Sequence, residues 1–221
     1  MAPLVTLTDP RSPSAEAYRT LRNNIQFSGL DHPVRTLLVT SAGAEEGKST
    51  TLCNLAVTIA QAGTSTIVVD CDLRRPSVHE ILDLSNDKGL TSALLDGDGD
   101  GLPLQPTAVP GLQALTSGPL PPNPADLLGS QRMQRMIETL AALAQLVLFD
   151  SPPASIFTDA AMLASRVDGV ILVISAGKTR REVASRAKGI LEKANARVLG
   201  VVLNNARVDK NLYRYYSSRG K

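Results

Sequence analysis

The sequence predicts an α/β domain with a mostly parallel sheet and helices on both of its faces. Short apolar runs that fit buried strands alternate with longer stretches that carry apolar residues at helical spacing. In such an alternation each helix crosses over between two parallel strands, so helices come to cover both faces of the sheet. The 221 residues are enough for one large domain with a complete core.

The N-terminal half begins this alternation. We expect a loop over residues 1–11 and then a helix that begins at Ser12-Pro13, because proline suits the first helical position, and ends at Gly29. The elements expected next are a strand, a helix closed by Gly63, and a strand, over 35–41, 49–62 and 65–70.

The C-terminal half continues the alternation after a stretch rich in glycine and proline, over 87–124, in which we expect one short helix and one strand, over 91–95 and 112–116. Helices and strands are then expected in turn over 133–145, 146–150, 158–167, 169–175, 179–195 and 197–204. Residues beyond Ala206 show no apolar period, which predicts a flexible tail.

The composition argues against several classes of function. A net charge of +2 gives no basic footprint for nucleic acid, so no nucleic-acid partner is expected. No apolar run is long enough to cross a membrane, and no secretory signal is visible, which predicts a soluble protein. Cys53 and Cys71 fit buried thiols in a reducing compartment, and neither histidine has a metal-ligand spacing.

The stretch SAGAEEGKST, over 41–50, predicts a phosphate-binding loop because it lies between an expected strand and an expected helix. Backbone N–H groups at a helix N-terminus favour anions, Lys48 can reach the β- and γ-phosphates of a nucleotide, and the Ser49 hydroxyl can bind Mg²⁺. The residues expected to contact the nucleotide here are Gly43, Ala44, Glu45, Glu46, Gly47, Lys48, Ser49 and Thr50.

Three residues of this loop depart from a simple phosphate-loop pattern. Ala42 stands where a glycine is expected, and it fits if its φ is negative. Glu45 and Glu46 bring two carboxylates into a phosphate site. We expect both side chains to point to solvent, because the cradle is made of backbone groups.

Three carboxylates follow strands of the expected sheet. Asp70 and Asp72 end one strand and Asp150 ends another. Ligands of open α/β sheets bind outside the carboxyl ends of the strands, so all three can converge near Lys48 and Ser49, where one could hold Mg²⁺ through water. The alternative, solvated acids at strand ends, stays open for each residue taken alone.

Six motifs together resemble the bacterial tyrosine kinases of polysaccharide export, a P-loop NTPase family with MinD/ParA-like architecture. They cover nearly the whole chain and read EAYRTLRNNI, GKST, VVDCDLRRP, LPPNPADLL, VLFDSPP and GVVLNN. The resemblance implies that Lys48 and the loop amides bind the phosphates of ATP. It also implies that Ser49 and, through water, Asp70 and Asp150 serve Mg²⁺. Asp72 would accept the proton of the attacking tyrosine hydroxyl, which completes a catalytic set of Lys48, Asp70, Asp72 and Asp150.

The same resemblance assigns roles outside the loop. Asn204 would contact adenine, and a ring of subunits would assemble through Glu16, Arg19 and Arg22. The phosphoacceptors would be the tail tyrosines of a neighbouring subunit, Tyr213, Tyr215 and Tyr216. The organisation is then an N-terminal segment with an oligomerisation helix, a kinase domain and a tyrosine-containing tail, over 1–29, 30–206 and 207–221.

One departure from the family concerns the loop. Family members usually have Pro-Gly-Glu before Gly-Lys, whereas this chain has Ala44, Glu45 and Glu46. If the missing glycine has a positive φ, a residue with a side chain is strained there, so binding is less affected by the departure than turnover.

The function implied is an ATP-dependent protein-tyrosine autokinase that regulates exopolysaccharide or capsule synthesis and export. A membrane adaptor would hold it at the inner face of the cell membrane, unless the chain is a fragment of a longer membrane protein. Two alternatives stay open. One is a ParA/MinD-like positioning ATPase, although such proteins carry an extra lysine where this chain has Gly43. The other is a nucleotide-bound ring component of an export complex without catalysis.

Overall fold

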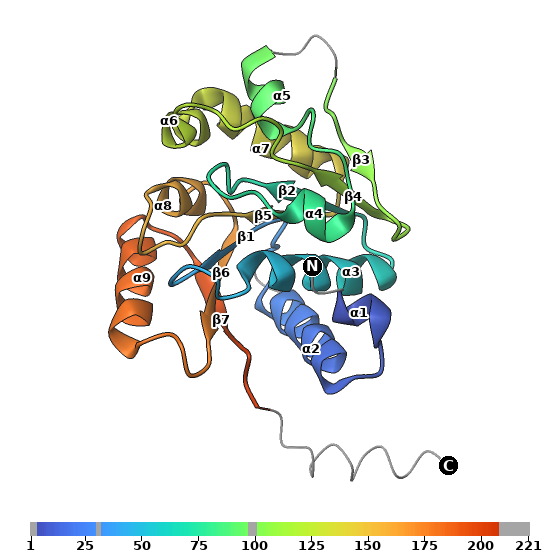
Figure 1. Cartoon of the computed structure of the whole chain (residues 1–221), viewed down its shortest axis with the longest axis vertical. Coiled ribbons are helices and arrows are strands. Elements are labelled where there is room, and N and C mark those ends of the chain that lie inside the picture. The colour runs from blue at the N-terminus through green and yellow to red at the C-terminus, as the bar shows by residue number, and fades with distance from the viewer. Residues whose placement is uncertain (1–3, 30–31, 97–100, 208–221) are drawn as a thin grey trace.

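The protein is built around a single seven-stranded sheet (Figure 1). The computed structural model describes residues 4–29, 32–96 and 101–207. The strand order is β3-β4-β2-β5-β1-β6-β7, and every neighbouring pair is parallel except β3 and β4. The strands are β1 Thr36–Ser41, β2 Thr66–Asp70, β3 Gln105–Pro106, β4 Leu112–Leu115, β5 Leu146–Asp150, β6 Gly169–Ser175 and β7 Val198–Asn204.

Helices cover both faces of this sheet, as the alternation predicts. They are α1 Val5–Thr8, α2 Pro13–Ser28, α3 Lys48–Gln61, α4 Val78–Leu82, α5 Leu90–Asp96, α6 Pro124–Gly129, α7 Gln131–Leu143, α8 Asp159–Ala164 and α9 Arg181–Lys193. Apolar side chains of α2 and α3 form one buried cluster with the sheet, and those of α7, α8 and α9 form a second cluster. Figure 1 shows α1, α2 and α3 gathered together on one side.

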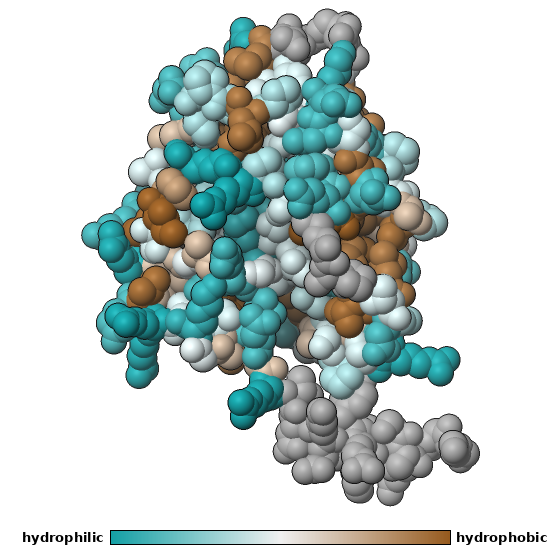
Figure 2. All heavy atoms as spheres, viewed as in Figure 1, coloured by the Kyte–Doolittle hydropathy of each residue, from teal (hydrophilic) through white to brown (hydrophobic). Residues whose placement is uncertain are grey.

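The helices and the exposed apolar residues are the features that bear on a membrane span. Within the described residues, no helix is both long enough and apolar enough to cross a bilayer. On the face drawn in Figure 2, apolar residues occur in separate small groups among polar ones. Such scattered exposure is normal for a folded domain and needs no partner to explain it.

Most elements lie where the sequence predicts them, and the helix start at Ser12 is confirmed because the Ser12 side chain accepts a hydrogen bond from the Ala15 amide. The loop expected over residues 1–11 is wrong in part, since α1 forms there. Asn54 Oδ1 of α3 accepts hydrogen bonds from both the amide and the hydroxyl of Thr6. This contact is tertiary, so no local pattern announces it.

Two further elements were not predicted. The short helix α4 follows the Asp70–Ser77 turn, and β3 adds an antiparallel edge to the sheet. Both are brief, with five and two residues, so they carry little periodicity. The predicted tail falls, from residue 208 onward, outside the described part of the chain.

Sheet topology brings the functional segments together. β1 lies between β5 and β6, and β2 pairs with β5 so that Asp70 stands opposite Asp150. Because these strands are parallel, the segments that follow β1, β2 and β5 all leave the same edge of the sheet. The phosphate loop and the three carboxylates are therefore neighbours, although they are far apart in the sequence.

Candidate active site

The phosphate loop occupies the turn between β1 and α3, as the motif predicts. Gly47 precedes the first residue of α3 with a φ of 84°, and a Cβ built on it would overlap the Asn204 side-chain amide. Only glycine fits both conditions. Ala42 is buried and its φ is not positive, so the alanine is tolerated as expected.

A cavity of about 260 Å³ opens in front of this loop. One wall consists of the loop and the first turn of α3, and the opposite wall is formed by residues that follow β2 and β5. The lining residues are Ala44, Glu45, Glu46, Gly47, Lys48, Ser49, Thr50, Asp72, Arg75, Ser77, Ile81 and Pro153. The cavity is thus placed where an anion would meet the N-terminus of α3.

The two loop glutamates behave differently from each other. Glu45 is exposed, as expected. Glu46 is only 3% exposed, so the expectation that it points to solvent is wrong. Its carboxylate accepts hydrogen bonds from the Gly43 amide, at 2.7 Å, and from the Thr179 hydroxyl. Glu46 therefore ties the loop to the segment after β6, which explains how a buried carboxylate is accommodated.

Glu45 adopts the left-handed region, with a φ of 57°. This is the position where the related family usually has glycine, so here a residue with a side chain adopts a φ that glycine takes without strain. A left-handed φ costs an ordinary residue about 1–2 kcal/mol. The loop therefore carries local strain at Glu45.

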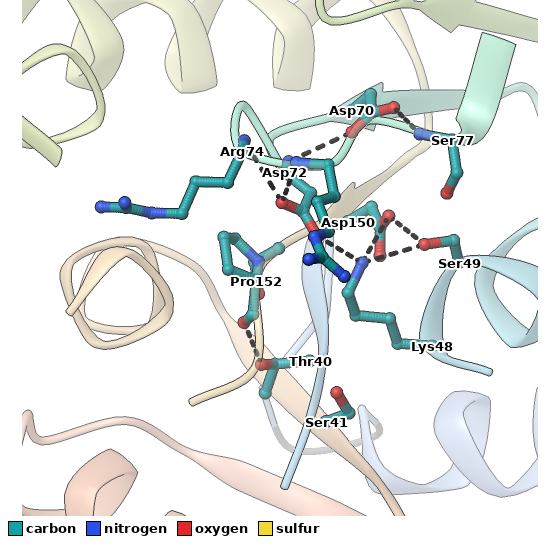
Figure 3. Close-up of polar contacts among 12 residues, drawn as sticks. Thr40, Ser41, Lys48, Ser49, Asp70, Asp72, Arg74, Ser77, Asp150 and Pro152 are labelled. Atoms are coloured by element: carbon teal, nitrogen blue, oxygen red, sulfur yellow. Dashed lines mark hydrogen bonds and ion pairs between the residues drawn. The ribbon is translucent and has the colours of Figure 1, made fainter. Parts of the chain in front are cut away.

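Lys48 stands at the centre of the charged groups (Figure 3). Its Nζ lies 2.8 Å from Asp72 Oδ2 and 3.2 Å from Asp150 Oδ2, and it donates to Ser49 Oγ at 3.0 Å. The Ser49 hydroxyl in turn donates to Asp150 Oδ2 at 2.5 Å. One ammonium thus joins the loop, the turn after β2 and the end of β5.

Asp70 and Asp72 shape the turn that follows β2. Asp70 accepts hydrogen bonds from three backbone amides, those of Asp72, Ser77 and Val78, with both of its oxygens. Asp72 Oδ1 accepts from the amide of Arg75 at 3.0 Å, while its Oδ2 faces Lys48. Asp72 is therefore held by the backbone on one side and presented to the cavity on the other.

Burial and mutual repulsion change the protonation of these groups. Burial raises the pKa of Asp70 to about 7, aided by the Asp150 charge and opposed by the Val78 amide. Burial also raises the pKa of Asp150, against the opposing effects of Lys48 and Ser49. Burial lowers the pKa of Lys48, but the Asp150 and Asp72 carboxylates outweigh it and raise the value overall. Lys48 is thus charged at neutral pH, and three carboxyl groups, those of Asp70, Asp72 and Asp150, share this one cation.

One oxygen of this cluster has no partner. Asp150 Oδ1 is buried and accepts no hydrogen bond in the described structure. Such orphaned oxygens are rare, and a cation is one of the groups that can satisfy them. Among the described residues no three acidic, histidine or cysteine side chains converge as a metal cage. The arrangement fits Mg²⁺, which binds through one or two carboxylates together with phosphates and water.

A latch beside the turn was not predicted. Arg74 makes a two-pronged ion pair with the buried Asp159 of α8, at 3.1 and 3.2 Å, and its guanidinium lies 4.2 Å from the centre of the Phe157 ring. Asp159 is 85 residues away in sequence, so its only local signal is an acid in the first turn of a helix. The latch fixes the residues next to Asp72.

The residues predicted to mediate assembly lie on α2, where all three have partners in the same chain. Arg19 pairs with Glu16 at 2.8 Å and donates to the Pro10 carbonyl, and both side chains are partly exposed. Arg22 is half-buried and donates to the Thr58 carbonyl in the last turn of α3. Arg22 therefore also joins α2 to α3.

A phosphate loop after β1, acids after β2 and β5, and a mostly parallel sheet define a P-loop NTPase. The ParA family model described as "NUBPL iron-transfer P-loop NTPase" matches residues 33–212. Tyrosine-protein kinase YwqD of Bacillus subtilis is 41% identical over 98% of this chain and 92% of its own. The chain belongs to the bacterial tyrosine-protein kinases of this class.

Solved structures agree with this assignment. The chimerical protein CapA2B2 has a TM-score of 0.88 at 36% identity, covering 93% of this chain and 90% of its own. The kinase domain of Escherichia coli tyrosine kinase ETK has a TM-score of 0.86 at 29% identity, covering 94% and 83%. In sequence, the whole E. coli protein etk is 31% identical over 91% of this chain, which matches 28% of its length.

Proposed function

We propose that the protein is an ATP-dependent protein-tyrosine autokinase that regulates exopolysaccharide or capsule synthesis and export. The observation that carries the proposal is the position of Lys48, which contacts Asp72 and Asp150 at the mouth of the phosphate-loop cavity. Membership of the bacterial tyrosine-protein kinases supports the reaction type. Phosphoryl transfer needs mainly positioning and charge stabilisation, which this site offers.

Lys48 would exchange partners when ATP binds. In the structure its Nζ lies 2.8 Å from Asp72 Oδ2, so the ammonium and the carboxylate neutralise each other. A nucleotide in the cradle offers phosphate oxygens to the same ammonium. Once Lys48 turns to them, Asp72 Oδ2 is free to accept the proton of a tyrosine hydroxyl, while the Arg75 amide still holds Oδ1.

The residues that would hold Mg²⁺ are Ser49 and Asp150, because they already contact each other and Asp150 Oδ1 lacks a partner. The cation would neutralise charge on the transferring phosphoryl group. We assign Asp70 to a water-mediated contact, since both of its oxygens are engaged by backbone amides. We keep Asn204 as a contact to adenine, on the resemblance to the family.

The phosphoacceptors proposed are Tyr213, Tyr215 and Tyr216 of a neighbouring subunit, which lie outside the described residues. Their side of the site would be cationic before reaction, because the chain beyond Ala206 carries five positive and one negative side chains, a net +4. Three phosphates would add roughly −4.5 to −6 and reverse that sign. Mass spectrometry should place the phosphate on these tyrosines, and phosphate found mainly on Tyr18 or on serines would contradict the proposal.

Assembly into a ring is proposed through Glu16, Arg19 and Arg22. Since Arg22 also bonds α3, the informative variant is Glu16→Ala with Arg19→Ala, which leaves that contact in place. Light scattering should show an assembly for the wild-type protein in Mg-ATP and a smaller species for the variant. An unphosphorylated wild-type protein that is monomeric at high concentration would remove the basis for the ring.

The location proposed is the inner face of the cell membrane, through a membrane adaptor. The support is indirect: the matched region of the E. coli relative is 28% of a much longer protein, so the kinase domain there is joined to further sequence. Co-purification of the protein with membranes only when the adaptor is expressed would support this arrangement.

The test of the reaction is incubation of the purified protein with Mg-ATP, followed by detection of phosphotyrosine. Lys48→Met is the matched negative control, because it removes the only cation inside the loop while keeping the length of the side chain. Phosphotyrosine in the wild type alone is expected, with ATP affinity strongly reduced in the variant. ATP hydrolysis without phosphotyrosine would favour a positioning ATPase, and binding without turnover would favour a non-catalytic ring component.

A further inference from the structure

The outer side of the phosphate loop carries an unbroken set of hydrogen bonds. Four consecutive backbone carbonyls each accept from a side chain. Ser41 Oγ donates to the Gly43 carbonyl at 2.7 Å. Lys178 Nζ donates to the carbonyls of the next two residues, Ala44 and Glu45, at 3.2 and 3.1 Å. The fourth bond runs from Asn204 Nδ2 to the Glu46 carbonyl at 2.9 Å.

These bonds fix which way the loop amides point. In a trans peptide the C=O of one residue and the N–H of the next lie in one plane and point in opposite directions, and the described chain contains no cis peptide. Holding the four carbonyls outward therefore turns inward the N–H groups of residues 44–47. Within the described chain these amides have no acceptor. They are donors left free for a ligand.

The donors stand outside the cavity that the amides face. Residues 44–47 line the cavity, whereas Ser41, Lys178 and Asn204 do not. Lys178 lies in the turn after β6, where its side chain is 52% exposed, and Asn204 ends β7. Their bonds to the loop thus act from behind it.

The two segments that supply these donors are joined to each other. The Ala176 amide donates to the Asn204 carbonyl at 2.8 Å, and Asn205 Nδ2 donates to Ser175 Oγ at 3.0 Å. Thr179, next to Lys178, donates to the Glu46 carboxylate. The ends of β6 and β7 therefore form one support against which the loop rests.

We propose that Lys178 and Asn204 are positioning residues that aim the loop amides at the nucleotide phosphates. The inference rests on the proposed function, because it concerns how the same site holds ATP. Neither residue has to touch the nucleotide for this role. The four N–H groups are ordered before the ligand arrives, so less free energy is spent on orienting them during binding.

Lys178 is tested by comparing Lys178→Met with Lys178→Arg, which keeps a cationic donor. Calorimetric titration with Mg-ADP should show about a tenfold loss of affinity for Lys178→Met and recovery of most of it for Lys178→Arg. In the kinase assay KM for ATP should rise while kcat changes little, because the amides hold the phosphates in both ground and transition states. Partial unfolding would instead lower kcat through the active fraction.

The control for the lost charge is Lys188→Met, on α9. Lys188 is similarly exposed and contacts Glu192 at 3.0 Å, away from the loop. Its substitution should leave Mg-ADP affinity within twofold of the wild-type value. A Lys188→Met protein as weakened as Lys178→Met would mean that long-range charge alone is responsible, and would overturn the inference for Lys178.

Asn204 is tested with Asn204→Leu, which has a similar shape and no donor. The probe is inorganic triphosphate with Mg²⁺, which has no base and competes with a fluorescent ATP analogue. A positioning role lowers affinity for triphosphate and for ATP by similar factors, several-fold each. A loss for ATP with unchanged triphosphate affinity would mean that Asn204 serves the adenine alone, and would overturn its positioning role.

The inference and the proposed function fail in different ways. A wild-type protein that binds Mg-ADP and makes phosphotyrosine, with Lys178→Met and Asn204→Leu unchanged in both, overturns the inference and leaves the kinase. A wild-type protein that binds no nucleotide overturns the proposed function first.

Discussion

The loop after β1 and the turn after β2 face each other across one cavity, and they are built in opposite ways. In the loop, over residues 43–47, the backbone is the functional part and the side chains behind it hold it in place. In the turn, over residues 70–77, side chains are functional and the backbone amides hold them, as at Asp70 and Asp72. On each side of the cavity, one kind of group faces the ligand and the other kind holds it in place: backbone amides held by side chains in the loop, and carboxylates held by backbone amides in the turn.

This difference decides which substitutions each side tolerates. The loop accepts Ala42 and even Glu45, because a backbone amide is nearly independent of its own side chain, provided that φ is kept. The turn has no such freedom, since Asp72 must offer a carboxylate to the cavity at a fixed place. The two departures from the family's Pro-Gly-Glu pattern, Ala44 and Glu45, lie in this loop.

The largest effect expected on the turn comes from Asp72→Asn. The asparagine oxygen can still accept the Arg75 amide, so the turn is kept while the base is lost. Phosphotyrosine formation should fall by about 10²–10⁴, with Mg-ATP affinity within a few-fold of wild type. Asp83→Asn is the control, because Asp83 lies after α4 with a φ of 56°, which asparagine tolerates. A collapse of ATP affinity in Asp72→Asn would reassign this residue to metal binding.

A second effect concerns how the free energy of unfolding depends on pH, and we expect it from Asp70 at the start of the turn. The pKa of Asp70 is raised from 3.8 to about 7, so between these values the folded protein keeps a proton that the unfolded chain has lost. Without Mg²⁺ and nucleotide, the free energy of unfolding should therefore fall as pH rises from about 4 to 7, by a few kcal/mol in order of magnitude.

Asp70→Asn should flatten that slope, because the group that titrates over this pH range is gone. Urea denaturation at a series of pH values measures it. Asp126→Asn, at an exposed position on α6, should keep the wild-type slope. A wild-type protein whose stability rises steadily over this range would show that Asp70 is charged without penalty.

The smallest effect is expected in the loop, from Glu45→Gly. Glycine adopts a φ of 57° without the ~1–2 kcal/mol cost of a side chain, and this gain exceeds the roughly 0.4–1 kcal/mol that glycine loses through its more flexible unfolded chain. The free energy of unfolding should therefore rise by about 0.5–1 kcal/mol. Thermal denaturation, with Glu45→Ala as the control that keeps a Cβ, measures the difference. Equal melting temperatures for the glycine and alanine variants would show that the strain at this position is no larger than the stability glycine loses through its more flexible unfolded chain.

The sequence by itself determined the six parallel strands, the larger helices and the two walls of the site. Apolar periodicity predicts the sheet, and the order strand, Gly-Lys-Ser, helix predicts the loop, because these features are local and repeat along the chain. The carboxylates at Asp70, Asp72 and Asp150 could also be placed, since parallel strands end at one edge. The family motifs place acidic residues at these strand ends, where a site for phosphates and Mg²⁺ requires them.

Only the tertiary structure decided which distant residues hold the two walls of the site and the N-terminal helix in place. Helix α1 depends on Asn54, the Arg74 latch on Asp159, and the burial of Glu46 on Thr179. Each of these partners lies tens of residues away, in a stretch whose own pattern predicts something ordinary. A buried polar group takes whichever partner the packed fold brings within hydrogen-bond distance, and no local periodicity records that choice. The support behind the phosphate loop is therefore a property of the fold, whereas the loop itself is a property of the sequence.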